Sequence, residues 1–210
     1  MKYVKMLGLA AIAAIAAMAF IGAGSASATT LCKVNTSPCP EASRYPVHST
    51  VLALSTEAVL SGSLSVTCHS HVTVLSESND GVGAPLLGKI TALTWTSCKG
   101  GCSSATTTLL PSGSLQGTTL TAGKTEVELK GCLGFATCKA TATEPKLTFN
   151  GGTIGGTASA KATNVPVTLS GFGCGSAGTW NAGGGSGGTP YVVTSVNGSS
   201  SGSVFVVASP

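Results

Sequence analysis

The residues best suited to chemistry lie close together at 66–74, VTCHSHVTV, where Cys68, His69 and His71 occupy four positions. Thiolates and imidazoles are the ligands that zinc and copper prefer, and the same side chains occur in redox and hydrolytic enzymes. The flanking Val and Thr residues predict an extended strand, in which successive side chains point to opposite faces. Cys68 therefore shares the apolar face with the valines and points inward, whereas both histidines point outward.

This alternation separates the cysteine from the imidazoles, so the three side chains cannot converge on one ion. An i, i+2 pair of histidines can chelate Zn²⁺ or Cu²⁺, but a stable site needs at least one more ligand. Nothing in the sequence places His48, the third histidine, nearby. We predict two exposed histidines on a sheet face, and we keep metal binding by His69 and His71 as the alternative.

Catalytic carboxylates are poorly represented. Glu126 and Glu128 have the spacing of one strand face beside Lys130, which is typical of a solvated surface, whereas a glycosidase takes its two carboxylates from separate elements. Asp80 is the only aspartate, and it lies in the turn sequence SNDG. A Ser-His-Asp triad would need Asp80, and no G-x-S-x-G nucleophile motif is present. We predict that the protein is not an enzyme.

Two glycine patterns resemble nucleotide-binding motifs. Residues 117–125 have five residues between the glycines where a P-loop has four, and residues 173–178 match G-x-G-x-x-G without a surrounding βαβ unit. We interpret both as turns and predict no cofactor.

Aromatic side chains are the remaining candidates for ligand binding. Trp95, Trp180 and Tyr191 could stack on sugar rings if they lay on an exposed sheet face, and core packing is the alternative. Trp180 precedes the glycine-rich stretch 181–188, and we predict it to be the most exposed of the three.

The pattern beyond Tyr45 is that of an all-β chain. Short segments rich in Val, Thr, Ile and Leu alternate with Gly, Pro, Asn and Ser, and no window shows a helical apolar stripe. In residues 124–131, KTEVELKG, Val127 and Leu129 share one face. We predict an antiparallel β-sandwich or jelly-roll-like double sheet, with residues 181–188 as a flexible hairpin loop inside it.

The first residues have the features of a secretory signal peptide. Two lysines precede an apolar run rich in Ala and Leu, and Ala-Ser-Ala at 26–28 fits the small-x-small rule for cleavage. A retained membrane anchor is the disfavoured alternative, because the run is at or below the length that spans a bilayer. We predict a signal peptide at 1–28, a single disulfide-stabilised domain at 29–210, and no stable membrane anchor after cleavage.

All eight cysteines follow the signal peptide. An even number of cysteines in an exported chain predicts disulfides. Sequence alone does not fix their connectivity, but three pairs are close along the chain, which leaves one long bridge. That bridge would close a loop worth about 4–5 kcal/mol in the chain-entropy account. The predicted pairs are Cys32–Cys39, Cys98–Cys102, Cys132–Cys138 and Cys68–Cys174, and the last pair predicts that the strand at 66–74 lies beside the one that leads into Cys174.

The charge excludes some partners. Lys and Arg number 11 against 7 Asp and Glu, a formal net charge of +4, and no basic cluster is present. This balance is too weak to direct the protein to nucleic acid or to anionic lipid.

The order of several segments resembles a known family. These segments are TTLCKVNTSPCPEASRYP, then VTC, GKITALTWTSC, GFGC, GTW and PYVVTSV. Together they resemble a paralogous family of exported, cysteine-containing proteins of actinobacteria. The resemblance implies secretion and a β-rich disulfide fold, and it assigns no catalytic residue.

We therefore expect a secreted, non-enzymatic extracellular or cell-envelope-associated protein, with a cell-wall or polysaccharide surface as its partner. The alternative is a carbohydrate- or small-ligand-binding module, and a secreted hydrolase ranks third.

Overall fold

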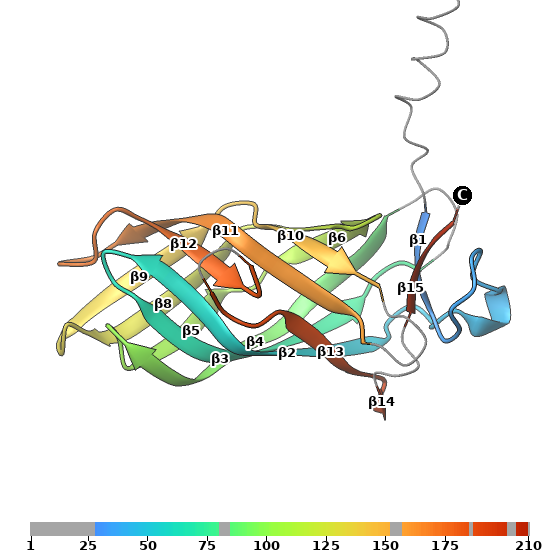
Figure 1. Cartoon of the computed structure of the whole chain (residues 1–210), viewed down its shortest axis with the longest axis horizontal. Helices are drawn as coiled ribbons and strands as arrows, with labels where there is room; N and C mark the ends of the chain where they lie inside the picture. The colour runs from blue at the N-terminus through green and yellow to red at the C-terminus, as the bar shows by residue number, and fades with distance from the viewer. Residues whose placement is uncertain (1–27, 80–84, 152–156, 185–186, 201–204, 210) are drawn as a thin grey trace, which may run out of the picture.

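The computed structural model describes residues 28–79, 85–151, 157–184, 187–200 and 205–209, which form strands and one 3₁₀ turn (Figure 1). None of the described helical residues forms a helix long and apolar enough to cross a membrane. The predicted signal peptide lies outside the described residues except for Ala28, which begins β1. The elements are β1 (Ala28–Cys32), η1 (Glu41–Ser43), β2 (Thr50–Gly62), β3 (Val66–Ser76), β4 (Leu86–Gly100), β5 (Ser104–Leu109), β6 (Ser112–Gln116), β7 (Thr119–Ala122), β8 (Thr125–Cys132), β9 (Ala136–Ala142), β10 (Lys146–Asn150), β11 (Ser159–Ser170), β12 (Ala177–Ala182), β13 (Tyr191–Val196), β14 (Ser199–Ser200) and β15 (Phe205–Ser209).

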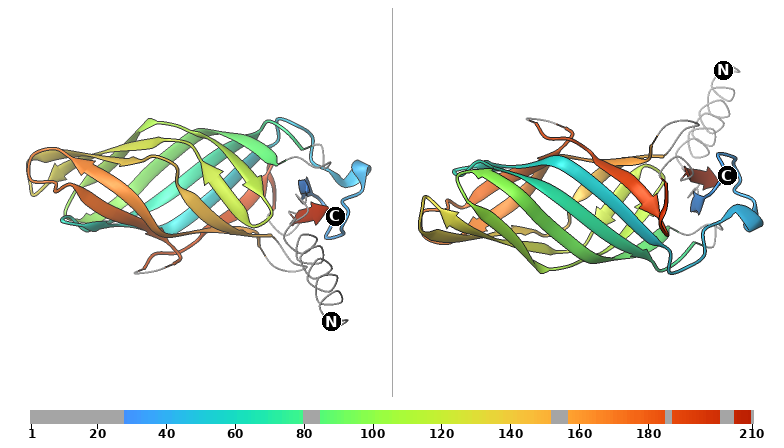
Figure 2. Two further views of the ribbon diagram at one scale, coloured as in Figure 1. Left: turned by 90° about the horizontal axis from the view of Figure 1, so that it is seen from above. Right: turned by 90° about the horizontal axis from the view of Figure 1, so that it is seen from below.

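The main sheet closes on itself as an eight-stranded antiparallel barrel (Figure 2). Four positions in the barrel are continuous strands, β2, β3, β4 and β11. Each of the other four is shared by two strands in succession, β5 and β6, β7 and β8, β9 and β10, and β12 and β13. β12 and β13 pair with β11 on one side and with β2 on the other, which closes the ring.

The predicted sandwich or jelly roll is therefore wrong in its architecture, although the all-β class is confirmed. A sandwich and a barrel require the same alternation of inward and outward side chains, because each has one buried face per strand. The alternation itself is as predicted. Cys68 is buried while His69 and His71 are exposed, and Val127 and Leu129 line the interior.

Proline or glycine residues lie at three of the interruptions between two strands that share one position in the barrel. Pro111 separates β5 from β6, Gly123 separates β7 from β8, and Pro145 separates β9 from β10. Proline has no N–H to donate to a sheet ladder, so a continuous strand is interrupted there. The prolines remain within the barrel wall as acceptors: Ile90 N donates to Pro111 O at 3.0 Å and Ala122 N donates to Pro145 O at 2.9 Å.

The glycine-rich stretch does not join two strands that pair with each other, which corrects the prediction for residues 181–188: residues 181–182 end β12, and Gly184 and Gly187 form an antiparallel bridge of their own. β12 and β13 both run antiparallel to β2, so the connection between them leaves the barrel and returns to the same position. A bulge of β2 faces this connection, and Thr189 fastens it there. The Thr189 amide donates to Glu57 O at 2.7 Å, and its hydroxyl accepts from Glu57 N at 2.9 Å.

Three disulfides gather at one end of the barrel, and a fourth lies at the other end. The first three are Cys68–Cys98, Cys102–Cys132 and Cys138–Cys174, with Cα–Cα distances of 4.1, 3.9 and 5.7 Å. The fourth, Cys32–Cys39, is the only predicted pair that is confirmed. Each of the first three closes a loop of about thirty residues, which is worth roughly 3–4 kcal/mol in the chain-entropy account.

The predictions Cys98–Cys102, Cys132–Cys138 and Cys68–Cys174 are wrong because neighbouring strands, and not neighbours in sequence, bring the sulfurs together. Cys98 on β4 lies across the strand pair from Cys68 on β3, and the turn after β4 carries Cys102 to the end of β8. β3 is not adjacent to β11, because β2 and β12 lie between them. Cys174 instead meets Cys138 on β9, the true neighbour of β11.

A tryptic digest of the unreduced protein distinguishes the two disulfide schemes. We expect peptide 45–89 to be joined to 90–99, and peptides 100–124, 131–139 and 162–210 to form one three-peptide species. Mass spectrometry before and after reduction measures this. The alternative scheme would instead give 131–139 as a single peptide with an internal bridge, and that product would contradict the structure.

Candidate ligand-binding cavity

The barrel encloses an apolar cavity of about 260 Å³. Side chains from all eight strand positions line it, and almost all of them are aliphatic or aromatic. An eight-stranded barrel is just wide enough either to be filled by its own side chains or to hold one small ligand. The cavity is therefore the feature of the described structure that is shaped to receive a molecule.

Small residues at inward positions leave this space unfilled. Seven alanines line the cavity where larger side chains would fill it, and five of them are buried: Ala58, Ala122, Ala140, Ala142 and Ala160. An empty apolar volume of this size costs on the order of 6 kcal/mol. That cost is comparable to the whole net stability of an ordinary domain, about 5–15 kcal/mol. A ligand that occupied the cavity would offset much of this free-energy cost.

The three aromatic residues singled out from the sequence, Trp95, Trp180 and Tyr191, all line this cavity. Trp180 is half-buried, as Trp95 is, and it packs edge-on against the buried Tyr191, with ring centroids 6.0 Å apart. No exposed aromatic row for stacking on a polysaccharide forms from these residues. Sequence reasoning missed the cavity because alternation shows which residues point inward but not whether they fill the interior.

Two polar groups in the cavity wall are already satisfied. The Tyr191 hydroxyl donates to Ser70 Oγ across the interior at 2.8 Å, and burial raises the pKa of Tyr191 far above its ordinary value, so the hydroxyl stays protonated. The indole of Trp95 donates to Thr107 Oγ1 at 2.9 Å, and Thr107 donates to the Leu93 carbonyl at 2.7 Å.

Trp180 differs from these two. Its Nε1–H is buried, and no described residue accepts a hydrogen bond from it. A buried donor without a partner costs free energy, so such groups are uncommon in folded proteins. Trp180 therefore lines the cavity and carries one buried donor without a partner among the described residues.

The N-terminal strand β1 lies at one end of the barrel, beside β15 (Figure 1). Leu31 is 4% exposed and reaches the cavity wall. The buried amide of Asn79 holds it in place: its Oδ1 accepts from Leu31 N at 2.8 Å, and its Nδ2 donates to Leu31 O at 2.9 Å and to Tyr45 O at 2.7 Å. β15 pairs with β1 on its other edge, so the two ends of the described chain meet at this cap.

The residues with potential for metal or acid–base chemistry do not converge. Within the described ranges, no group of three or more His, Cys, Asp or Glu residues is placed to hold a metal ion, and every cysteine is in a disulfide. His69 and His71 lie on the outer face of β3. Asp80 lies outside the described residues. Gly117 and Gly173, in the two nucleotide-like glycine motifs, lie in turns at positive φ, although residues 119–122 of the first motif form β7.

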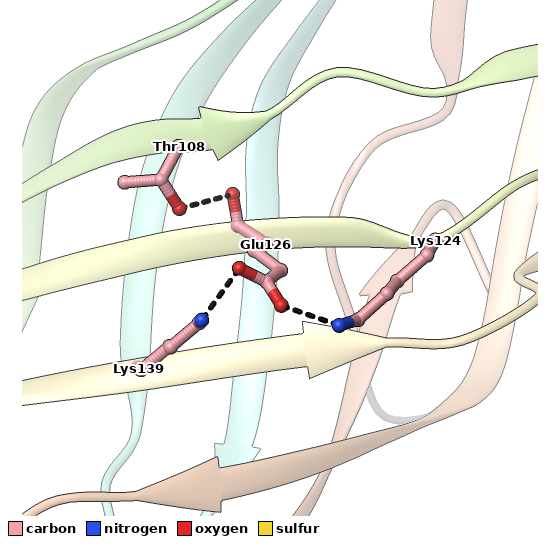
Figure 3. Close-up of polar contacts among 4 residues, drawn as sticks. All are labelled: Thr108, Lys124, Glu126 and Lys139. Atoms are coloured by element: carbon pink, nitrogen blue, oxygen red, sulfur yellow. Dashed lines mark hydrogen bonds and ion pairs between the residues drawn. The ribbon is translucent and has the colours of Figure 1, made fainter.

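Glu126 belongs to an ion-pair network on the outside of the barrel (Figure 3). Its carboxylate pairs with Lys124 at 2.7 Å and with Lys139 on β9, and its backbone carbonyl accepts from the Thr108 hydroxyl at 3.4 Å. Hydrogen bonds from Lys124 and Lys139 lower the pKa of Glu126. Glu128 pairs with Lys130 at 3.0 Å. The Glu126–Lys139 pair joins β8 to β9, whereas Glu128 and Lys130 both lie on β8.

Comparison of the chain with protein-family models, with curated proteins and with solved structures finds no match.

The Glu126 network predicts a pH-dependent contribution to stability. Because the pKa of Glu126 is lower in the folded chain than in the unfolded chain, the ion pairs stabilise the fold above the unfolded-state pKa, and this is lost as the pH falls through the folded-state pKa. We expect Glu126→Gln to lower the melting temperature at pH 7 and to have no effect near about pH 2. Glu128→Gln, which removes a single exposed pair, is the control. An equal effect of Glu126→Gln at both pH values would contradict this account.

Proposed function

We propose that the protein is exported, is not an enzyme, and binds a small apolar molecule inside the barrel. The observation that carries this proposal is the cavity of about 260 Å³ with its apolar wall. The four disulfides are consistent with an oxidising, extracellular compartment. The cell envelope remains the setting we expect for the protein.

The cavity size limits the ligand. A cavity of roughly 150 Å³ holds benzene, and pockets for drug-sized molecules begin at roughly 300 Å³. At about 260 Å³, the barrel accommodates a molecule of one or two fused rings, or a short alkyl chain of similar volume.

The wall composition sets the polarity of the ligand. A charged group would lose its hydration in this interior, and no described ionisable side chain in the wall other than the protonated Tyr191 faces it. The Trp180 indole supplies one free donor. The ligand class we propose is a neutral apolar molecule with one hydrogen-bond acceptor. This favours small-ligand binding over carbohydrate binding, because a sugar would bring many hydroxyl groups with no partners.

Filling the cavity tests the site. Ala140 lies on β9 with its side chain in the cavity wall, so we expect Ala140→Leu to occupy part of the cavity. The variant should melt at a higher temperature, because filling a void typically adds about 0.5–2 kcal/mol. It should also bind N-phenyl-1-naphthylamine at least about tenfold more weakly, since 1.4 kcal/mol of lost contact corresponds to that factor. Energy transfer from Trp95 and Trp180, which both line the cavity, measures the binding.

Thr168→Leu is the matched control for this substitution. Thr168 is exposed on β11, the strand that pairs with β9, so the added side chain points away from the interior. This variant should bind the probe as the unchanged protein does. If the unchanged protein fails to bind the probe, or if Ala140→Leu binds it equally well, the proposed site is wrong.

Trp180→Phe tests the polarity of the ligand. The substitution keeps an aromatic wall and removes the single free donor. We expect it to weaken binding of 2-acetylnaphthalene about fivefold and to leave the affinity for 2-ethylnaphthalene unchanged. A neutral hydrogen bond contributes about 1 kcal/mol, which corresponds to a factor of about five in affinity. Competition with N-phenyl-1-naphthylamine measures both affinities. An equal loss for the two ligands would show that Trp180 acts through packing alone.

A further inference from the structure

The most exposed large apolar side chains among the described residues all lie at one end of the barrel. Leu133 is 56% exposed, Phe135 is 76% exposed and Phe172 is 82% exposed, whereas the other exposed large apolar residues lie between 37% and 42%. We call these three residues the apolar tip. They occupy the β8–β9 turn and the β11–β12 loop, which project from the end opposite β1 and β15 (Figure 1).

The two segments form a single surface. A Cβ placed on Gly173 would lie 3.1 Å from Leu133 Cδ1, so the loop that holds Phe172 touches the turn that holds Leu133 and Phe135. The Cys138–Cys174 disulfide joins the same two segments covalently. The three side chains are therefore presented together.

The apolar tip cannot fold back into the protein. The space beneath it is occupied by buried Leu64 and by the buried sulfurs of the Cys102–Cys132 and Cys138–Cys174 disulfides. Gly171 could not carry a side chain, because a Cβ there would lie 2.5 Å from the Thr137 carbonyl oxygen. The exposure of Phe135 and Phe172 thus results from a rigid and closely packed base.

The distribution of charged residues around the apolar tip indicates the kind of surface that the tip would bind. The four connections at this end, residues 63–65, 101–103, 133–135 and 171–176, contain no charged residue. The segment at the opposite end, 33–49, contains several. Exposed Lys99, Lys130 and Lys139 lie on strands behind the tip, where Glu128 and Glu126 pair with the last two.

This distribution fits a lipid surface better than a protein partner. The hydrocarbon region of a membrane rejects charged groups, and apolar loops with lysines set further back match the order of acyl chains and phosphate headgroups. We propose that the apolar tip inserts into a lipid surface and holds the barrel end-on against it. The proposal is independent of the cavity, although a carrier of apolar molecules would meet its ligand in the same phase.

Vesicle binding tests the apolar tip. The mature chain, oxidised, is sedimented with vesicles of phosphatidylcholine alone and with vesicles that also contain phosphatidylglycerol. We expect binding to both, with at most a small preference for the anionic lipid because Lys130 and Lys139 are paired with Glu128 and Glu126, and a loss of at least tenfold in partitioning for Phe135→Ser combined with Phe172→Ser. Leu109→Ser combined with Leu110→Ser is the matched control, because these two leucines are exposed on the side of the barrel, away from the tip, and it should bind as the unchanged protein does.

Binding of N-phenyl-1-naphthylamine to the same variants shows that the barrel remains folded and keeps this test separate from that of the cavity. Equal sedimentation of the unchanged protein and the Phe variant would overturn the proposal, as would sedimentation with anionic vesicles alone that the Phe substitutions leave intact. A lack of vesicle binding, together with a dimer that the Phe substitutions dissociate on gel filtration, would overturn it in favour of an interface between two copies of the chain.

Discussion

The closure of the sheet by β12 and β13 on β2 is the constraint on which the remaining features depend. Once Trp180 pairs with Leu60 and Val193 pairs with Ala53, the number of strand positions is fixed at eight. The number of strands sets the width of the interior. At that width, inward alanines such as Ala140 leave space that the protein does not fill itself. An open double sheet could collapse around the same residues, whereas a closed ring cannot.

Different interactions stabilise the two ends of the barrel. One end is held by three disulfides, which stabilise it by restricting the unfolded chain. Because the disulfides hold this end together, its loops do not need charged residues for that purpose. The other end is held to the barrel by hydrogen bonds between the buried Asn79 and the strand that carries Leu31, because its Cys32–Cys39 disulfide joins residues only seven apart within the cap itself. Covalent bonds resist local opening, whereas a cap held by hydrogen bonds can detach at much lower cost. The structure therefore places its apolar tip on the rigid end and its more easily opened cap at the other.

Much of the local structure could be predicted from the sequence. The alternation that places Cys68 inside and His69 and His71 outside follows from the period of a strand, and the structure agrees. The disulfide partners could not be predicted, because pairing depends on which strands are neighbours: Cys98 is four residues from Cys102, yet it bonds across the sheet to Cys68. The place of Trp180 in the cavity wall could not be predicted for a related reason, since a glycine-rich neighbour indicates a loop but not which way the preceding side chain points.

By itself the sequence determined that the chain is made of strands, that its cysteines form disulfides, and which residues share a face. These properties depend only on the spacing of residues along the chain. In a strand, successive side chains alternate between the two faces, so the local sequence is enough to predict them. Only the tertiary structure decided that the sheet closes, which cysteines meet, and that Trp95, Trp180 and Tyr191 surround one cavity. Those properties depend on the register between strands more than a hundred residues apart, such as β2 and β13, and no local pattern carries that information.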